Sequence, residues 1–195
     1  MSHDLIKELR EITGAGLMDV KEALESSDHD KEKALEHLRK KGIAKLAKKA
    51  DRITKDGLIE TYIHPGNKLG VLLEINCETD FVSRTDDFKQ LAKDIALHIA
   101  AGNPLYISRE QVPPEVIEKE QEIAKAQGEG KPEDVVSKMI VGKLEKYYEE
   151  VCLMEQSFIK NPEIRISQLI AEAVGKMGEN IQVKRFSRFV LGSEN

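Results

Sequence analysis

The chain has 195 residues, of which 40% are hydrophobic and 33% are charged, and its formal net charge is −5. This balance is typical of a globular protein and excludes a disordered or membrane-embedded chain. The length allows one domain with an appendage or two small domains. The negative charge argues against a protein whose main task is to coat nucleic acid.

The sequence shows no membrane segment. No apolar run approaches the roughly 20 residues that span a bilayer, and no signal of a charged and then apolar stretch precedes the first expected helix. We therefore expect a cytoplasmic protein without a membrane partner.

The two cysteines, Cys77 and Cys152, each lie within an apolar run. This placement favours buried, reduced thiols over a disulfide or a metal-binding pair. The five histidines are scattered without the spacing of metal ligands. We therefore expect no metal site and no cofactor.

Residues 4–41 show the apolar spacing of three short helices. A glycine-rich turn separates the first two helices, and Gly42 is expected to end the third. We assign residues 1–50 to an N-terminal three-helix module. The apolar faces of its helices are formed by Leu5, Ile6, Leu9 and Ile12, then Leu17, Val20 and Leu24, then Ala34, Leu35 and Leu38.

The stretch 39–49 contains six basic residues and no acidic one. It is explained by a solvated connecting helix, with binding to RNA or to an acidic partner as the alternative. RNA binding is not favoured, because the chain as a whole is acidic. A domain boundary is expected between Lys49 and Asp56.

The rest of the chain predicts an α+β fold. Residues 58–64 and 69–77 form two strand patterns joined by a loop with proline and glycine. An amphipathic helix over 86–101 should cover this sheet. Residues 181–191 are typical of a third strand, whose apolar phase slips near Phe186 and so predicts a β-bulge. We expect about three antiparallel strands packed by helices.

We assign residues 51–195 to this core domain, including a helical pair over 113–151. Glycines and a proline divide the two helices of the pair, which suggests an antiparallel arrangement. Residues 152–156 fit either a short strand or the tail of the second helix. A further helix follows Ser167 and ends at Gly178.

The segment 76–84, with the sequence NCETDFVSR, places an aromatic side chain directly after a strand pattern. Turns in such places are usually short and polar. Phe81 fits either a core aromatic or an exposed anchor for a partner. The adjacent Asp80 favours the anchor, because a carboxylate needs water or a donor.

Two possible sites of chemistry are not supported. The pair of glycines at Gly14 and Gly16 lies between helices and lacks the strand of a dinucleotide site, so we expect no direct nucleotide binding. Asp80, Asp86 and Asp87 have no catalytic partner at a defensible spacing. We therefore do not expect an enzyme.

Three separated groups of residues resemble the elongation factor Ts family, in the family's order and over nearly the whole chain. The groups are Leu9-Arg10-Glu11 with Thr13–Gly16, Met18-Asp19 and Lys21–Leu24, then Asn76–Val82, then Lys176–Ile181. The resemblance implies a ubiquitin-associated-like fold for the N-terminal module. It also implies guanine nucleotide exchange on elongation factor Tu, the GTPase that delivers aminoacyl-tRNA to the ribosome.

The resemblance further implies which residues meet the GTPase domain of elongation factor Tu. The segment beside its Mg²⁺ and phosphate site would be Thr79, Asp80, Phe81 and Val82, with Asp80 and Phe81 inserted so that GDP leaves and GTP can bind. Contacts from the N-terminal module would be Arg10, Leu17 and Met18. Contacts from the core would be Met177 and Gly178.

The chain departs from the longer members of this family, which carry a duplicated core and a protruding helical hairpin. Only one core unit fits in 195 residues. A single core is expected to complete its binding surface as a homodimer, which would give a 2:2 complex. The helices over 113–151 are the candidate element for dimerisation or for packing on the core.

Overall fold

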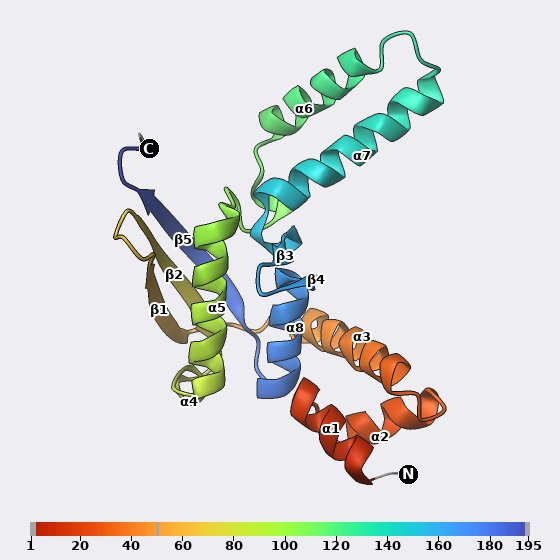
Figure 1. Cartoon of the computed structure of the whole chain (residues 1–195), viewed down its shortest axis with the longest axis vertical. Coiled ribbons are helices and arrows are strands. Elements are labelled where there is room, and N and C mark those ends of the chain that lie inside the picture. Colours follow the sequence, from red (N-terminus) through yellow and green to blue (C-terminus); the bar gives the residue numbers. More distant parts are fainter. Residues whose placement is uncertain (1–2, 50, 194–195) are drawn as a thin grey trace. The chain divides into compact units, whose positions relative to one another are not determined.

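The computed structural model describes residues 3–49 and 51–193, and Figure 1 shows its elements. The chain forms two compact units. The first takes the described residues up to 97 and from 167 onward, and the second takes residues 98–166. Among the described residues, no helix is long and apolar enough to cross a membrane.

The first unit begins with the three expected helices, α1 (His3–Thr13), α2 (Leu17–Ser26) and α3 (Lys31–Lys49). Their inward faces bury a small apolar core, because leucine, valine and alanine recur at helical spacing on each. The core residues are Ile6, Leu9, Val20, Ala23, Leu24, Ala34 and Leu38. The prediction of three helices is confirmed.

The expected end of the third helix at Gly42 is wrong, because α3 continues as one helix to Lys49. Gly42 is buried, and a Cβ atom added to it would lie 3.4 Å from the backbone oxygen of Ala171 in α8 (Ile166–Met177). The glycine therefore allows two helix backbones to approach closely and does not act as a C-cap. The predicted boundary after residue 49 stays a prediction.

The sheet of the first unit has the order β1-β2-β5 and is antiparallel throughout, as expected. Its strands are β1 (Asp56–Ile63), β2 (Leu69–Cys77) and β5 (Gln182–Val190). Glu74 pairs with Arg185, but Ile75 pairs with Val183, so Lys184 is the extra residue of a bulge. This bulge confirms the predicted irregularity and lies two residues before Phe186.

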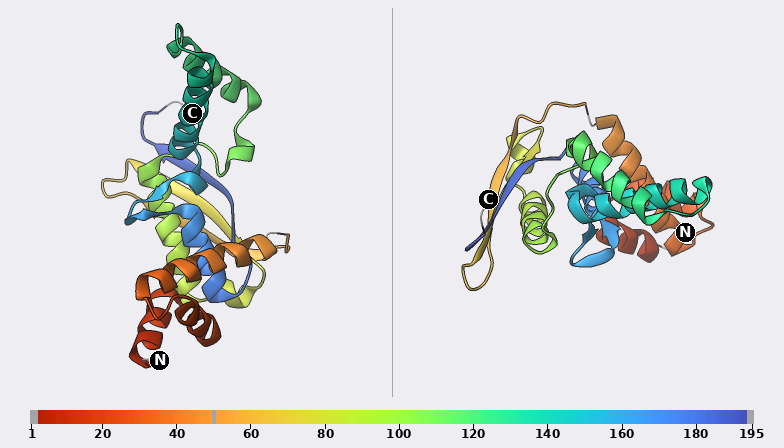
Figure 2. Two further views of the ribbon diagram at one scale, coloured as in Figure 1. Left: turned by 90° about the vertical axis from the view of Figure 1, so that its right-hand side faces the viewer. Right: turned by 90° about the horizontal axis from the view of Figure 1, so that it is seen from above.

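One face of the sheet is covered by α5 (Asp86–Gly102), as Figure 2 shows. Val71, Leu73 and Ile75 of β2 point to this face and are buried, together with Phe88 and Ile95 of α5. The strict alternation of β2 and the helical spacing of α5 thus produce one shared core.

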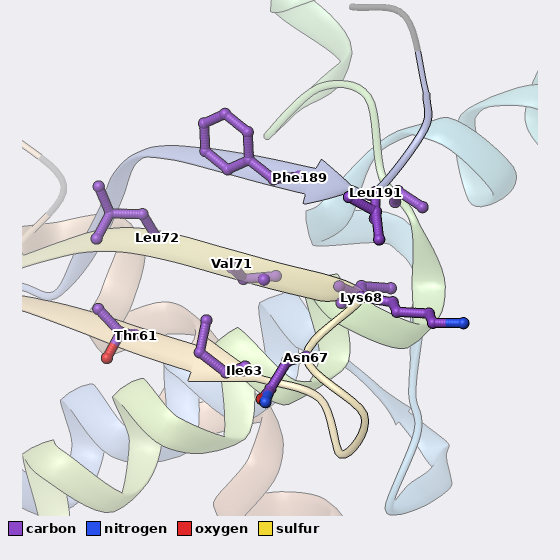
Figure 3. A pocket seen from close by; sticks show the side chains of 11 residues that line it. Thr61, Ile63, Asn67, Lys68, Val71, Leu72, Phe189 and Leu191 are labelled. Carbon is purple, nitrogen blue, oxygen red and sulfur yellow. The ribbon is translucent and has the colours of Figure 1, made fainter.

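The opposite face of the sheet carries exposed apolar side chains. Leu72 lies on this face, and the pairing of Gly70 with both Ile63 and Phe189 places those two residues there as well. They line a shallow pocket of about 490 Å³ together with Leu191, as Figure 3 shows. Ile63, Leu72, Phe189 and Leu191 are called the open sheet face below.

The second unit contains the expected antiparallel pair, α6 (Pro114–Gln127) and α7 (Glu133–Val151). Short 3-10 helices at Arg109–Gln111 and Leu153–Glu155 flank it. A small hairpin of β3 (Ser157–Phe158) and β4 (Asn161–Arg165) follows, which the sequence did not predict.

Residues 152–156 form neither a regular strand nor a simple continuation of α7. Cys152 makes an isolated parallel bridge with Tyr106, and the 3-10 turn follows it. The buried His98 fixes the next segment, because its Nε2 contacts Gln156 Oε1 at 2.9 Å and its Nδ1 accepts the Ile159 amide at 3.2 Å. Burial lowers the pKa of His98, so the neutral ring is favoured.

Candidate functional site

The segment after β2 folds into a one-turn helix, α4 (Asp80–Ser83), that separates an exposed face from a buried face. Phe81 is 79% exposed, whereas Val82 on the other face is only 6% exposed. The alternative of a core aromatic at Phe81 is therefore wrong. Val82 anchors the turn on the core in this structure, while Thr79 and Asp80 are exposed beside Phe81.

The start of α4 is held by a carboxylate from a distant part of the chain. Glu179 accepts hydrogen bonds from the amides of Glu78 and Thr79, both at 3.0 Å, and from the hydroxyl of Thr79 at 2.6 Å. Hydrogen bonds to an ionised acceptor are stronger than neutral ones. The approach to Phe81 is thus fixed by three hydrogen bonds to one carboxylate.

Glu78 makes the reciprocal connection. Its carboxylate accepts the amide of Asn180 at 2.7 Å and lies 3.4 Å from the guanidinium of Arg52. The side-chain amide of Asn180 in turn donates to the backbone oxygen of Arg52 at 2.9 Å. Residues 78–79 and 179–180 therefore exchange bonds in both directions.

The buried side of α4 is also tied to the sheet. Ser83 donates its hydroxyl to Asp56 at the start of β1 at 2.9 Å. The thiol of Cys77 donates to the backbone oxygen of Thr79 at 3.1 Å, and burial raises the pKa of this thiol to about 11. The turn consequently has fixed contacts on both of its flanks, which leaves Phe81 as its exposed projection.

The predicted contact surface of the N-terminal module lies around the turn between α1 and α2. Met18 is 74% exposed and Leu17 is 43% exposed, and Arg10 is exposed on α1. Gly14 has a positive φ of 64°, and its amide donates to the Arg10 oxygen at 2.8 Å. This left-handed turn is readily adopted by glycine, and it sets the direction in which α2 leaves α1.

The end of α8 lies against this module. A Cβ atom added to Gly14 would lie 2.5 Å from Cγ of Lys176, and a cleft of about 200 Å³ is lined by Gly14, Lys176 and Met177 among others. Met177 is half-buried in this cleft, and Gly178 is exposed with a positive φ of 80°. Lys49 of α3 also donates to the Gly178 oxygen.

All three predicted groups of contact residues are therefore linked within the first unit. Glu179, which directly follows Gly178, accepts hydrogen bonds at the start of α4. Lys176, which directly precedes Met177, packs against Gly14 in the turn after α1. Sequence reasoning missed the role of Glu179 and Glu78. The only available signal was that both glutamates lie within the two motifs, and no local pattern connects positions 100 residues apart.

Two acidic residues near the turn, Asp80 and Asp87, form ion pairs. Asp80 lies 2.7 Å from Arg84, and Asp87 lies 2.6 Å from Lys176. Ion pairs on the surface add little to the free energy of unfolding, but they give each of these two carboxylates a basic partner. Within residues 3–49 and 51–193, no group of His, Cys, Asp or Glu side chains is arranged to hold a metal ion.

The comparisons with known proteins agree with one another and cover nearly the whole chain. The model of the family "Elongation factor TS" matches residues 3–193. The elongation factor Ts of Carboxydothermus hydrogenoformans is 58% identical over 98% of this chain and 89% of its own length. That of Herpetosiphon aurantiacus is 52% identical over 99% of this chain and 98% of its own length. That of Thermotoga petrophila is 56% identical, over 98% and 96% respectively.

Proposed function

Because the chain belongs to the elongation factor Ts family, we propose that it acts in translation elongation as the guanine nucleotide exchange factor of elongation factor Tu. The observation that carries the proposal to this chain's own residues is the exposure of Phe81 on a firmly held turn. An apolar ring held in water is poised to be buried in a partner. The protein would work in the cytoplasm and perform no covalent chemistry.

The exchange follows from differential binding. The factor binds nucleotide-free elongation factor Tu more tightly than the GDP complex. By linkage, it lowers the affinity of elongation factor Tu for GDP by the same ratio. Phe81, with Asp80 beside it, would enter the GTPase domain near the Mg²⁺ and phosphate site. The cavity for the ring would exist only when the residues that hold Mg²⁺ have moved, so that inserting the ring favours GDP release.

One ring is not enough for the whole effect. Burying a phenylalanine contributes about 1.5–3 kcal/mol, which is roughly one to two decades in an equilibrium constant. Other contacts must therefore bring the turn to the site. Docking would use the exposed Arg10, Leu17 and Met18 of the N-terminal module and the adjoining Met177 and Gly178.

The open sheet face supports a homodimer, and with it a 2:2 complex. Its apolar side chains come from all three strands and surround a shallow pocket. A contiguous apolar patch of this kind usually marks an interface. Phe189→Lys should therefore shift a dimer toward monomer in sedimentation equilibrium, and an unchanged mass would contradict this interface.

The function is tested by following the release of a fluorescent GDP from purified elongation factor Tu in a stopped-flow instrument. The wild-type chain should accelerate release, and Phe81→Ala should reduce the second-order rate constant about 10- to 100-fold. Leu105→Ala, which truncates another exposed apolar side chain, serves as the control. No acceleration by the wild type would refute exchange activity, and full activity of Phe81→Ala would refute the insertion of its ring.

A further inference from the structure

Resting on the proposed exchange function, we propose that Glu179 is a positioning residue for exchange, which holds residues 78–81 so that Phe81 is presented in its inserting orientation. Glu179 does not itself enter the partner in this account. It acts through the turn, and its effect on exchange should therefore depend on Phe81.

The hydrogen bonds of Glu179 leave no oxygen of its carboxylate idle. Oε2 accepts the amides of Glu78 and Thr79 at 3.0 Å each, and Oε1 accepts the Thr79 hydroxyl at 2.6 Å. All three donors belong to the two residues that immediately precede α4. A carboxylate is well suited to this place because it only accepts.

The turn needs this support. β2 ends at Cys77, whose partner Asp56 is the first residue of β1, so the amides of Glu78 and Thr79 lie beyond the ladder. Thr79 is the N-cap of α4, but its side chain makes no capping bond and donates to Glu179 instead. A helix of four residues is too short to be stable alone. Without Glu179, these donors would form hydrogen bonds with water instead, and the start of α4 would fray.

The same residue couples two of the proposed contact segments. Gly178 adopts a positive φ directly after α8, which turns the chain so that Glu179 reaches residues 78–79. A second hydrogen bond runs in the opposite direction, from the amide of Asn180 to the carboxylate of Glu78. The contacts at Met177 and Gly178 are therefore held in register with Phe81, and a partner that meets one segment meets the other in a set geometry.

Order before binding lowers the entropic cost of insertion, since the turn does not have to be fixed at the moment of contact. If only a fraction of the molecules present Phe81 correctly, the apparent affinity for the inserted state falls by that fraction. Loss of Glu179 should thus reduce exchange without removing any atom that touches the partner.

The test is Glu179→Gln in the GDP-release assay. The amide keeps the size of the side chain but turns one acceptor into a donor that faces a donor. We expect the second-order rate constant of release to fall about 10-fold, as for the loss of a charge-assisted bond. Glu163→Gln, on the exposed part of β4, is the matched control and should behave as the wild type.

Two further measurements separate positioning from a general loss of structure. The amide protons of Glu78 and Thr79 should exchange with solvent at least about 10-fold faster in free Glu179→Gln, while those of β2 keep their protection. The double variant Glu179→Gln with Phe81→Ala should lose little more than Phe81→Ala alone, because one change acts through the other. Additive losses would show that Glu179 acts elsewhere and would overturn the proposal.

The remaining outcomes are also decisive. If the wild type fails to accelerate GDP release, the exchange function fails, whereas amide exchange still reports on the hold of Glu179 over the turn. If the wild type accelerates release and Glu179→Gln does so equally, the positioning role is refuted. Should Glu179→Gln not fold, Thr79→Val removes one of the three bonds at nearly constant volume, and equal activity of that variant would refute the role.

Discussion

The turn that carries Phe81 and the N-terminal surface that carries Met18 present exposed apolar side chains in different ways. The turn depends on Glu179, about 100 positions away, and on contacts with β1. The N-terminal surface depends on a local core within three helices. The order of the Phe81 turn therefore depends on the folding of the whole first unit, whereas the N-terminal surface depends on residues close to it in sequence.

This difference suggests a division of work. A surface built locally on a small module is suited to first contact, where broad apolar exposure matters more than exact orientation. A single ring on a braced turn is suited to insertion, where misplacement is costly. The following predictions test this division, from the largest expected effect to the smallest.

Removing the local support should affect the module most strongly. Leu24 is fully buried in the core of the three helices, and Leu24→Ala should lower the free energy of unfolding of that module by about 2–5 kcal/mol. Hydrogen exchange followed by mass spectrometry should show lost protection in residues 17–49 and retained protection in β2. Equal loss in both regions would mean that the two regions fold as one unit.

Changing the exposed surface should separate docking from insertion. Met18→Glu places a charge where burial on the partner is proposed, and we expect the Kd for elongation factor Tu to rise about 10- to 100-fold. The fold should be unaffected because the side chain is exposed. A titration that gives the wild-type Kd would remove the N-terminal surface from the docking step.

A substitution at the junction should disturb both regions moderately. Gly14→Ala forces a side chain into a left-handed conformation and against Lys176, which should cost about 1–2 kcal/mol of stability. Thermal unfolding measures this cost. Gly16→Ala is the comparison, because Gly16 has a negative φ and its nearest contact for an added Cβ lies at 3.7 Å. Equal destabilisation by both variants would contradict this account of Gly14.

The smallest effect is expected from pH, and it concerns neither region. Burial lowers the pKa of His98 below its ordinary value of 6.5, so the unfolded chain binds a proton more readily than the folded one. Stability from this group is complete above pH 6.5 and is lost as the pH falls toward the folded pKa. Urea unfolding at pH 7.5 and 5.5 should show a smaller pH dependence in His98→Gln than in the wild type, and an equal dependence would contradict this role.

Periodic segments could be predicted from the sequence, and contacts between distant segments could not. The helical spacing of apolar residues in α5 and their alternation in β2 predict the sheet and the face that α5 covers, because burial of one face requires a different period in a helix and in a strand. Gly42 does not end α3, because its packing on Ala171 outweighs its local tendency to end a helix. The 3-10 turn after Cys152 has too few residues for any period.

The candidate site shows the same limit. The position of Phe81 after a strand left a core aromatic and an exposed anchor open, and the adjacent Asp80 favoured the anchor. The exposure of Phe81 excludes the core aromatic, and its contact with a partner stays a prediction. The role of Glu179 depends on a turn at Gly178 and on how α8 packs, so no sequence window contains it. Motifs that are far apart in sequence can therefore indicate a site before its internal bonds are known.

The two buried thiols have a practical consequence. Cys77 and Cys152 are the only cysteines of the chain, and burial raises the pKa of each to about 11. The thiolate is the reactive form, and near pH 7 only roughly one in ten thousand such groups is ionised. A cysteine introduced at an exposed position, such as Leu105, would therefore react first with a maleimide dye. The native chain is thus already suited to site-specific labelling for watching the factor arrive and leave.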